Sequence, residues 1–123
     1  PMSILAASYE GYAAVLLDPK GTKHLTKVVH PGNQQNPKGT RGASEIKNGY
    51  FRKPDPAGKD RAGGAFVATI EPWHGNQVVV YTGSPFDRTP KRQVLDDHLR
   101  WGHAVWCADL DGDGADALVV GVR

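Results

Sequence analysis

The sequence predicts an all-β fold made of short antiparallel strands. Short runs rich in β-branched and aromatic residues recur along the chain, separated by segments that contain glycine, proline or charged residues. The 15 glycines and 9 prolines in 123 residues are typical of a loop-rich all-β protein. One strand pattern also occurs three times, at residues 5–10, 66–71 and 118–123. We therefore expect a single domain built from a repeated group of strands.

The first 30 residues predict a three-stranded meander. The first apolar run ends at Glu10-Gly11, and the second ends at the turn sequence Asp18-Pro19-Lys20-Gly21. A third run alternates polar and apolar residues and stops at Pro31-Gly32. The expected strands are residues 4–9, 12–17 and 24–29.

The remaining chain predicts two polar loops and six further strands. Residues 31–41 and 52–64 contain prolines, glycines and polar side chains with little to bury, so both are expected to be loops. Residues 96–100 are compatible with one helical turn. Strands are expected at residues 43–46, 66–70, 77–82, 93–95, 103–108 and 117–122.

The repeated segments indicate how the strands group. The segments after the repeated strand also match, residues 12–17 with 77–82 and residues 24–29 with 92–97. Four strands in roughly 40–50 residues is the size of a β-propeller blade. With the strands of a blade called a to d from the axis outward, the chain has the order b-c-d, a-b-c-d and a-b. The prediction is a partial β-propeller with one complete four-stranded antiparallel blade, residues 42–99, flanked by two incomplete blades, residues 1–30 and 100–123.

Incomplete blades have consequences for the partners of the chain. They leave unpaired strand edges, and so few blades cannot close a ring in which each blade packs against two neighbours. We therefore expect the chain either to associate with copies of itself or to belong to a larger propeller.

The most specific motif is the acidic stretch from Asp109 to Asp116. Its carboxylates recur at every second position and its two glycines permit a tight turn, so several oxygens can face one hard cation. The flanking segments are predicted strands, which indicates a metal-clipped hairpin rather than the helix pair of an EF-hand. The expected ligands for calcium or magnesium are Asp109, Asp111, Asp113, the carbonyl of Ala115, and Asp116.

The run from Gly102 to Gly121, with the acidic loop at its centre, resembles the FG-GAP/VCBS repeat of β-propeller proteins. The resemblance implies that the loop joins the two innermost strands of a blade and holds calcium or magnesium in a structural or binding role. Related repeats occur in surface adhesion proteins, so an adhesion module is an alternative. The family usually has a carboxylate at the ninth loop position, where this chain has Ala117. The site therefore has one ligand fewer than the family pattern.

Charged residues occupy equivalent positions at the ends of the three repeated segments. Glu10, Glu71 and Arg123 align with one another, and strand ends near the axis of a propeller line its central depression. We therefore expect these residues to face one cavity, where Glu10 and Arg123 bind a ligand. The alternative is that each is a solvated charge at the end of a strand.

Two histidines lie near these positions in the predicted blades. His74 follows Trp73 in a turn, and His103 begins the innermost strand of the last blade. Imidazole groups near carboxylates can transfer protons near neutral pH or bind a transition metal such as zinc. A histidine in a turn is also often a hydrogen-bonded structural residue. Trp73 is either a platform on which a sugar stacks, and so a substrate-binding residue, or a residue that packs two blades together.

Several segments are similar to the propeller part of aldos-2-ulose dehydratase-like proteins, namely residues 6–11, 43–46, 68–75 and 102–103. This resemblance implies a carbon–oxygen lyase that removes water from an oxidised sugar, as an alternative to a non-enzymatic role. Glu71, His74 and His103 would then be catalytic, with a histidine or the glutamate as the base and a metal polarising the carbonyl.

Bulk properties narrow the range of functions. The net charge of +2 and the scattered basic residues give no support for nucleic-acid binding. The single cysteine, Cys107, excludes an internal disulfide and is expected to be a buried thiol. No apolar run approaches the roughly 20 residues of a membrane span, and no signal peptide is recognised, so no compartment is predicted. The sequence also lacks the motifs of serine hydrolases, phosphate loops and dinucleotide-binding folds.

Overall fold

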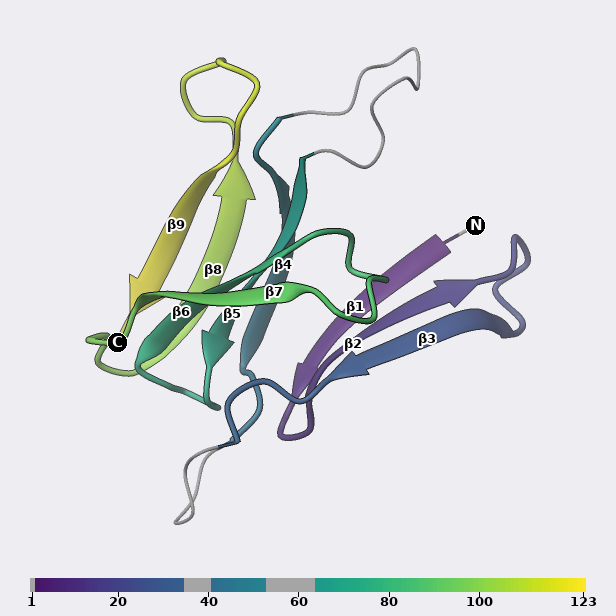
Figure 1. The fold of residues 1–123 in the computed structure, drawn as a ribbon, viewed down its shortest axis with the longest axis horizontal. Helices are drawn as coiled ribbons and strands as arrows, with labels where there is room; N and C mark the ends of the chain where they lie inside the picture. Colours follow the sequence, from purple (N-terminus) through teal and green to yellow (C-terminus); the bar gives the residue numbers. More distant parts are fainter. Residues whose placement is uncertain (1, 35–40, 53–63) are drawn as a thin grey trace.

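The computed structural model describes residues 2–34, 41–52 and 64–123, and these residues form nine β-strands (Figure 1). None of the described residues lies in a helix, and so none forms a helix that could cross a membrane. Pro1 and the middle parts of the two predicted loops, residues 35–40 and 53–63, lie outside the described residues. The strands are β1 (Met2–Ser8), β2 (Gly11–Leu17), β3 (His24–His30), β4 (Glu45–Tyr50), β5 (Ala65–Glu71), β6 (Gln77–Thr82), β7 (Lys91–Asp96), β8 (Gly102–Ala108) and β9 (Ala117–Val122).

The strands form three antiparallel sheets in chain order. The first sheet contains β1, β2 and β3, the second contains β4 to β7, and the third contains β8 and β9. Each strand pairs with its sequence neighbours within the sheet. The predicted all-β fold and its groups of three, four and two strands are confirmed. Because the repeated segment begins in β1 and recurs in β5 and β9, the sheets correspond to the orders b-c-d, a-b-c-d and a-b.

The second sheet is covered on both faces. On one face Phe66 packs in a core with Val105 of β8, and on the other face Val67 packs in a core with Tyr12 of β2. Because successive side chains of a strand point to opposite faces, these two cores place the second sheet between the first and the third. All of β5 after its first residue is buried, so this strand is the centre of the described structure.

The inner strands of the three sheets lie next to one another. β4 contacts both β1 and β8, and Figure 1 shows the third sheet at one end of the molecule and the first at the other. Within the second sheet, Gly49 of β4 pairs with Phe66 and lies under its ring, where an added Cβ atom would come within 2.4 Å of Cζ. Glycine at this strand position therefore leaves room for the aromatic ring.

Two elements differ from the prediction. The helical turn expected at residues 96–100 is wrong, because β7 extends to Asp96 and a bend follows it. The Asp96 carboxylate accepts a hydrogen bond from the His98 N–H at 2.7 Å, a local bond that competes with helix formation. The strand expected at residues 43–46 instead spans Glu45–Tyr50, because its pairing with β5 continues over this whole length.

Candidate functional site

The turn between β5 and β6, the segment before β8 and the end of β9 meet at one end of the sheets. The Gly102 N–H donates to the Gly75 carbonyl at 3.0 Å, and the Arg123 N–H donates to the Trp101 carbonyl at 3.1 Å. These backbone hydrogen bonds join three parts of the chain that are far apart in sequence. They hold both candidate histidines close to Arg123.

His74 and His103 form a contacting pair. Their ring centroids lie 4.5 Å apart and their planes are inclined by 42°. Both residues are exposed, and neither imidazole has a hydrogen-bond partner among the described residues. The ring nitrogens are therefore accessible to a small molecule. Both histidines were predicted from the sequence as candidate site residues, and the structure brings them together.

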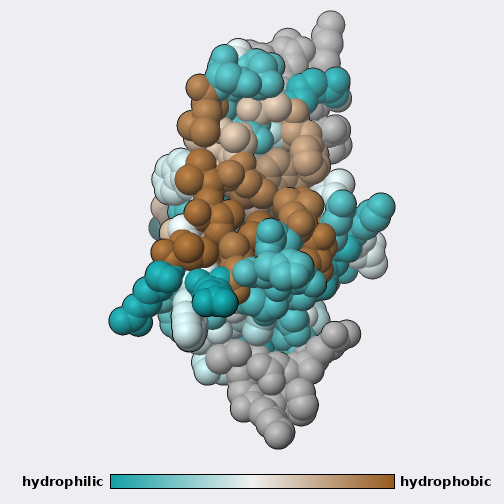
Figure 2. All heavy atoms as spheres, turned by 90° about the vertical axis from the view of Figure 1, so that its left-hand side faces the viewer, coloured by the Kyte–Doolittle hydropathy of each residue, from teal (hydrophilic) through white to brown (hydrophobic). Residues whose placement is uncertain are grey.

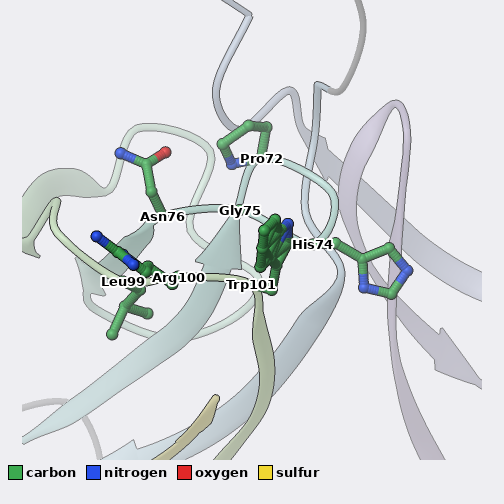
Figure 3. A pocket seen from close by; sticks show the side chains of 7 residues that line it. All are labelled: Pro72, His74, Gly75, Asn76, Leu99, Arg100 and Trp101. Carbon is green, nitrogen blue, oxygen red and sulfur yellow. The ribbon is translucent and has the colours of Figure 1, made fainter. Parts of the chain in front are cut away.

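The histidine pair lies in a hollow of the surface. His74, Trp101, His103 and Arg123 line a space of about 560 Å³, a volume typical of small-molecule sites. His74 and Trp101 also line a neighbouring hollow of about 400 Å³. In Figure 3 the Trp101 indole stands between the His74 ring and the side chains of Asn76, Leu99 and Arg100, which also line this second hollow. Its other lining residues are Pro72 and Gly75.

Trp101 is a site residue that the sequence analysis did not identify. It is 60% exposed and has a φ of 50°, a conformation that residues other than glycine rarely adopt. His74 has a similar φ of 51°. Such backbone conformations cluster at binding and catalytic sites. The signal in the sequence was an aromatic residue two positions before a candidate histidine.

Trp73 lies beside the histidine pair but does not line either hollow. Its ring stacks on Tyr9 with centroids 5.5 Å apart and meets the His74 ring edge-on at 5.1 Å. Tyr9 lies in the turn after β1, so this stacking joins the first and second sheets. The contact supports the packing interpretation of Trp73, and one face of its ring is already covered.

Glu71 does not face the hollow, contrary to the expectation that it converges with the histidines. Its carboxylate is fully buried and accepts hydrogen bonds from the Thr69 hydroxyl at 3.0 Å and the Tyr81 hydroxyl at 2.5 Å. Arg92 donates to the second carboxylate oxygen from two nitrogens, at 2.6 and 3.2 Å. Burial and the adjacent Glu71 charge raise the pKa of Tyr81, so its hydroxyl remains a donor. The hydrogen bonds from Thr69, Tyr81 and Arg92 therefore give Glu71 a structural role.

Glu10 also lies away from the hollow. It is exposed in the turn after β1, and its carboxylate accepts a hydrogen bond from the Ser8 hydroxyl at 2.8 Å, which lowers its pKa. Of the three aligned charged residues, only Arg123 lines the hollow. Equivalent positions in the repeat therefore do not meet at one cavity in the described structure.

The acidic loop between β8 and β9 brings three carboxylates together. Asp109, Asp111 and Asp113 each offer an oxygen, and these oxygens lie within 4.8 Å of one another. The Asp109 carboxylate also accepts hydrogen bonds from the N–H groups of Gly112 at 2.8 Å and Gly114 at 3.0 Å, which closes the loop around it. Three clustered carboxylate oxygens fit a hard cation such as calcium or magnesium.

Asp116 has a different structural role in this loop. Its carboxylate accepts a hydrogen bond from the Tyr50 N–H at 2.8 Å, while its own N–H donates to the Tyr50 carbonyl at 2.8 Å. It therefore ties the loop to the end of β4 and is not a member of the carboxylate group. Ala117, which follows it, begins β9 and supplies no side-chain ligand.

Among the described residues, Asp109, Asp111 and Asp113 are the one group of three or more His, Cys, Asp or Glu side chains placed to share a metal ion. His74 and His103 are not part of such a group. Zinc at the histidine pair, which the sequence analysis considered, would therefore have two side-chain ligands of these types from the described residues. The hard-cation site and the histidine hollow are separate, because they lie at opposite ends of β8.

No protein-family model matches the chain, and no solved structure matches it. Among curated proteins, the chain is similar to aldos-2-ulose dehydratase from Phanerodontia chrysosporium. The two sequences are 41% identical over 76 residues, which covers 51% of this chain and 8% of the relative. The chain thus spans less than a tenth of the length of the curated relative that it matches. The comparison shows a distant, partial similarity to a dehydratase.

Proposed function

We propose that the chain contributes a site for an oxidised sugar and takes part in removing water from it, as a carbon–oxygen lyase of the aldos-2-ulose dehydratase type. The observation that carries this proposal is the hollow in which His74 and His103 contact each other beside Trp101 and Arg123. The partial match to a dehydratase supports the same substrate class from the sequence.

Removal of water from a sugar with a carbonyl at the second carbon needs one base and one acid. The base takes the proton from the carbon next to the carbonyl, and the bonding electrons form a carbon–carbon double bond. The hydroxyl on the following carbon leaves as water after it receives a proton from the acid. A neutral imidazole can be the base and a protonated one the acid, so His74 and His103 supply both groups, and exchange with solvent then restores their protons.

Arg123 and Trp101 suit the binding of such a substrate. The guanidinium group of Arg123 has several N–H donors for carbonyl and hydroxyl oxygens. The exposed indole of Trp101 offers a flat apolar surface against which a sugar ring can pack. Glu71 has no part in proton transfer in this proposal, because its buried carboxylate is held by three other side chains.

A dehydration assay tests this proposal. An aldos-2-ulose is added to the chain, binding is measured by calorimetry, and the conjugated product is followed by its ultraviolet absorbance. His74→Gln and His103→Gln should each lower the rate by about 10²–10⁴-fold, as expected for the loss of a general acid or base. His98→Gln is the matched control, because the His98 side chain is 90% exposed and lies outside the hollow.

The control variant should retain the rate of the unsubstituted chain, and all variants should keep the same circular dichroism spectrum. Dehydration that survives both site substitutions would contradict the proposed roles. Absence of both binding and dehydration in the unsubstituted chain would contradict the proposal as a whole.

The acidic loop supports a second function, the binding of a hard cation. Calcium or magnesium held by Asp109, Asp111 and Asp113 would reduce the repulsion among three neighbouring negative charges at the β8–β9 turn, in line with the FG-GAP/VCBS resemblance. We infer a structural role for this cation, because the loop is at the far end of β8 from the histidine pair. An adhesion role has no separate observation in its favour.

A further inference from the structure

The third sheet has one apolar face on which no other sheet of the described structure packs; at its edge the Lys47 ammonium group lies 4.5 Å from the centroid of the Trp106 ring. Val105 pairs with Val120 and Cys107 pairs with Leu118, and these four residues face the second sheet. The alternate pairs therefore point away from it. Trp106 and Val119, which form one such pair, are 58% and 47% exposed. We call this surface the C-face; its residues are Ala104, Trp106, Ala108, Ala117, Val119 and Gly121.

Figure 2 shows an apolar patch on this side of the molecule, with charged and polar residues around it. None of the C-face residues carries a charge or a side-chain hydrogen-bonding group other than the indole N–H. Apolar patches with polar rims on a protein surface are typical of interaction sites.

The first sheet has a corresponding surface at the other end of the molecule. Tyr12, Ala14 and Val28 are buried toward the second sheet, so the alternate residues of the same strands point away from it. Among these, Met2 is 59% and Val29 49% exposed. We call this surface the N-face; its apolar residues are Met2, Ile4, Ala6, Ala13, Val15, Leu17 and Val29, and Lys27 is its charged residue.

We propose that the N-face of one copy of the chain packs against the C-face of a second copy, head to tail, so that two copies close into a ring. The two junctions within the chain already have this form, since apolar residues of the first and third sheets pack on opposite faces of the second. The N-face and the C-face are the surfaces at which the same series of junctions would continue. Two copies of three sheets each give six sheets, within the roughly four to eight blades of closed propellers.

A head-to-tail arrangement is favoured over a symmetric contact of one face with itself. A dimer built on the C-face alone would cover Trp106 but leave the N-face exposed, and the reverse holds for the N-face. A closed head-to-tail pair covers both apolar surfaces in two equivalent junctions. It leaves no terminal sheet with an uncovered face. This inference does not depend on the proposed lyase function.

Sedimentation velocity of the chain and of three glutamate variants tests the inference. Trp106→Glu places a charge in the C-face, and Val29→Glu places one in the N-face. Leu110→Glu adds the same charge at a residue that is 67% exposed in the acidic loop, outside both faces. The unsubstituted chain and Leu110→Glu should have about twice the 13.3 kDa mass of one chain. Trp106→Glu and Val29→Glu should each be monomeric, because every junction of the pair contains one altered face.

Mixing Trp106→Glu with Val29→Glu distinguishes the arrangements. The mixture should form a dimer through its one unaltered junction, with an affinity at least tenfold below that of the unsubstituted chain. A monomeric unsubstituted chain at all concentrations would overturn the inference. So would a Val29→Glu variant that stays dimeric while Trp106→Glu dissociates, or the reverse, since either result indicates a symmetric contact. If a glutamate variant unfolds, Ile4→Lys and Val119→Lys replace it at the same faces.

Discussion

Glu71 ends β5 with a fully buried carboxylate that is joined to Thr69, Tyr81 and Arg92. A buried charge is tolerated in a protein interior when it is paired and hydrogen-bonded. The network connects β5 to β6 and β7 directly before the turn that carries His74. Glu71 therefore supports the end of the sheet on which the histidine hollow is built.

We expect Glu71→Ala to lower the free energy of unfolding by about 2–4 kcal/mol, because Arg92 and Tyr81 lose a partner in a largely dry environment. The Arg92 side chain is partly exposed, so water can hydrate its guanidinium group after the substitution. This hydration limits the loss of unfolding free energy. Urea denaturation measures the change. Glu10→Ala removes an exposed carboxylate and should leave the urea midpoint almost unchanged. Equal effects of the two substitutions would contradict the buried network.

Cys107 is a half-buried thiol that packs against the core between the second and third sheets. Burial raises its pKa to about 11, with a further increase from the nearby Asp116 charge. Because the folded state holds the thiol proton more tightly than the unfolded state does, this contribution to stability is present below about pH 9 and is lost as the pH rises toward 11.

The rate of Cys107 alkylation by iodoacetamide should therefore rise with a midpoint near pH 11 in the folded chain, because the thiolate is the reactive form. The same measurement in denaturant should have its midpoint at the ordinary thiol value of about 8.5. Circular dichroism confirms that the chain stays folded over the range. A folded-state midpoint equal to the denatured one would show that the thiol is not shielded.

At the scale of single residues, the sequence predicted part of the candidate site. Arg123 was identified because the repeat placed it at a strand end, and His74 and His103 because imidazoles near carboxylates can transfer protons or bind a metal; the structure brings the three residues together. The position of Glu71 in the repeat also predicted that it faces the cavity, and this prediction was wrong. A repeat indicates where a strand ends, but it does not indicate which side chains a neighbouring sheet covers. Trp101 was missed because its proximity to His103 in the sequence was a weak signal, and its orientation in the site depends on an unusual backbone conformation.

The β8–β9 hairpin depends on its acidic loop at the scale of an element. The loop carries three clustered carboxylates at its tip and is attached to β4 by the paired hydrogen bonds between Asp116 and Tyr50. The two features should affect stability differently. The carboxylate cluster is stabilised by a cation, whereas the attachment to β4 is present with or without one.

We expect calcium to raise the midpoint of thermal unfolding of the unsubstituted chain relative to a chelator. Asp111→Ala should abolish this difference, because it removes a ligand from the cluster. Asp116→Ala should lower the midpoint in both conditions but preserve the difference, since Asp116 bonds to Tyr50 instead. Identical midpoints of the unsubstituted chain in calcium, magnesium and chelator would contradict a metal site in this loop.

The elements themselves were largely predictable, because apolar runs with turn residues between them determine where strands begin and end. The exceptions have local causes. The extent of β4 depends on its pairing with β5 and on Gly49, which accommodates the Phe66 ring. The absence of a helical turn after β7 depends on the hydrogen bond between the Asp96 carboxylate and the His98 N–H.

At the scale of the whole molecule, the chain is a series of similar sheets packed face to face. The order of three, four and two strands was predictable from the repeated segments, because the matching segments indicate which strands occupy equivalent places in their sheets. The relative placement of the turns at the ends of these sheets was not predictable, since it depends on how neighbouring sheets pack. The candidate hollow is formed by that packing, because its residues come from the second and third sheets.

The most direct test of the proposed function is a magnetic-resonance titration of the chain, labelled at its five histidines, with an aldos-2-ulose. We expect the ring signals of His74 and His103 to shift together and to saturate at the same sugar concentration. The signals of His24, His30 and His98, which lie outside the hollow, should remain unchanged. Unchanged signals from His74 and His103, or equal shifts of all five histidines, would contradict a sugar site at the histidine pair.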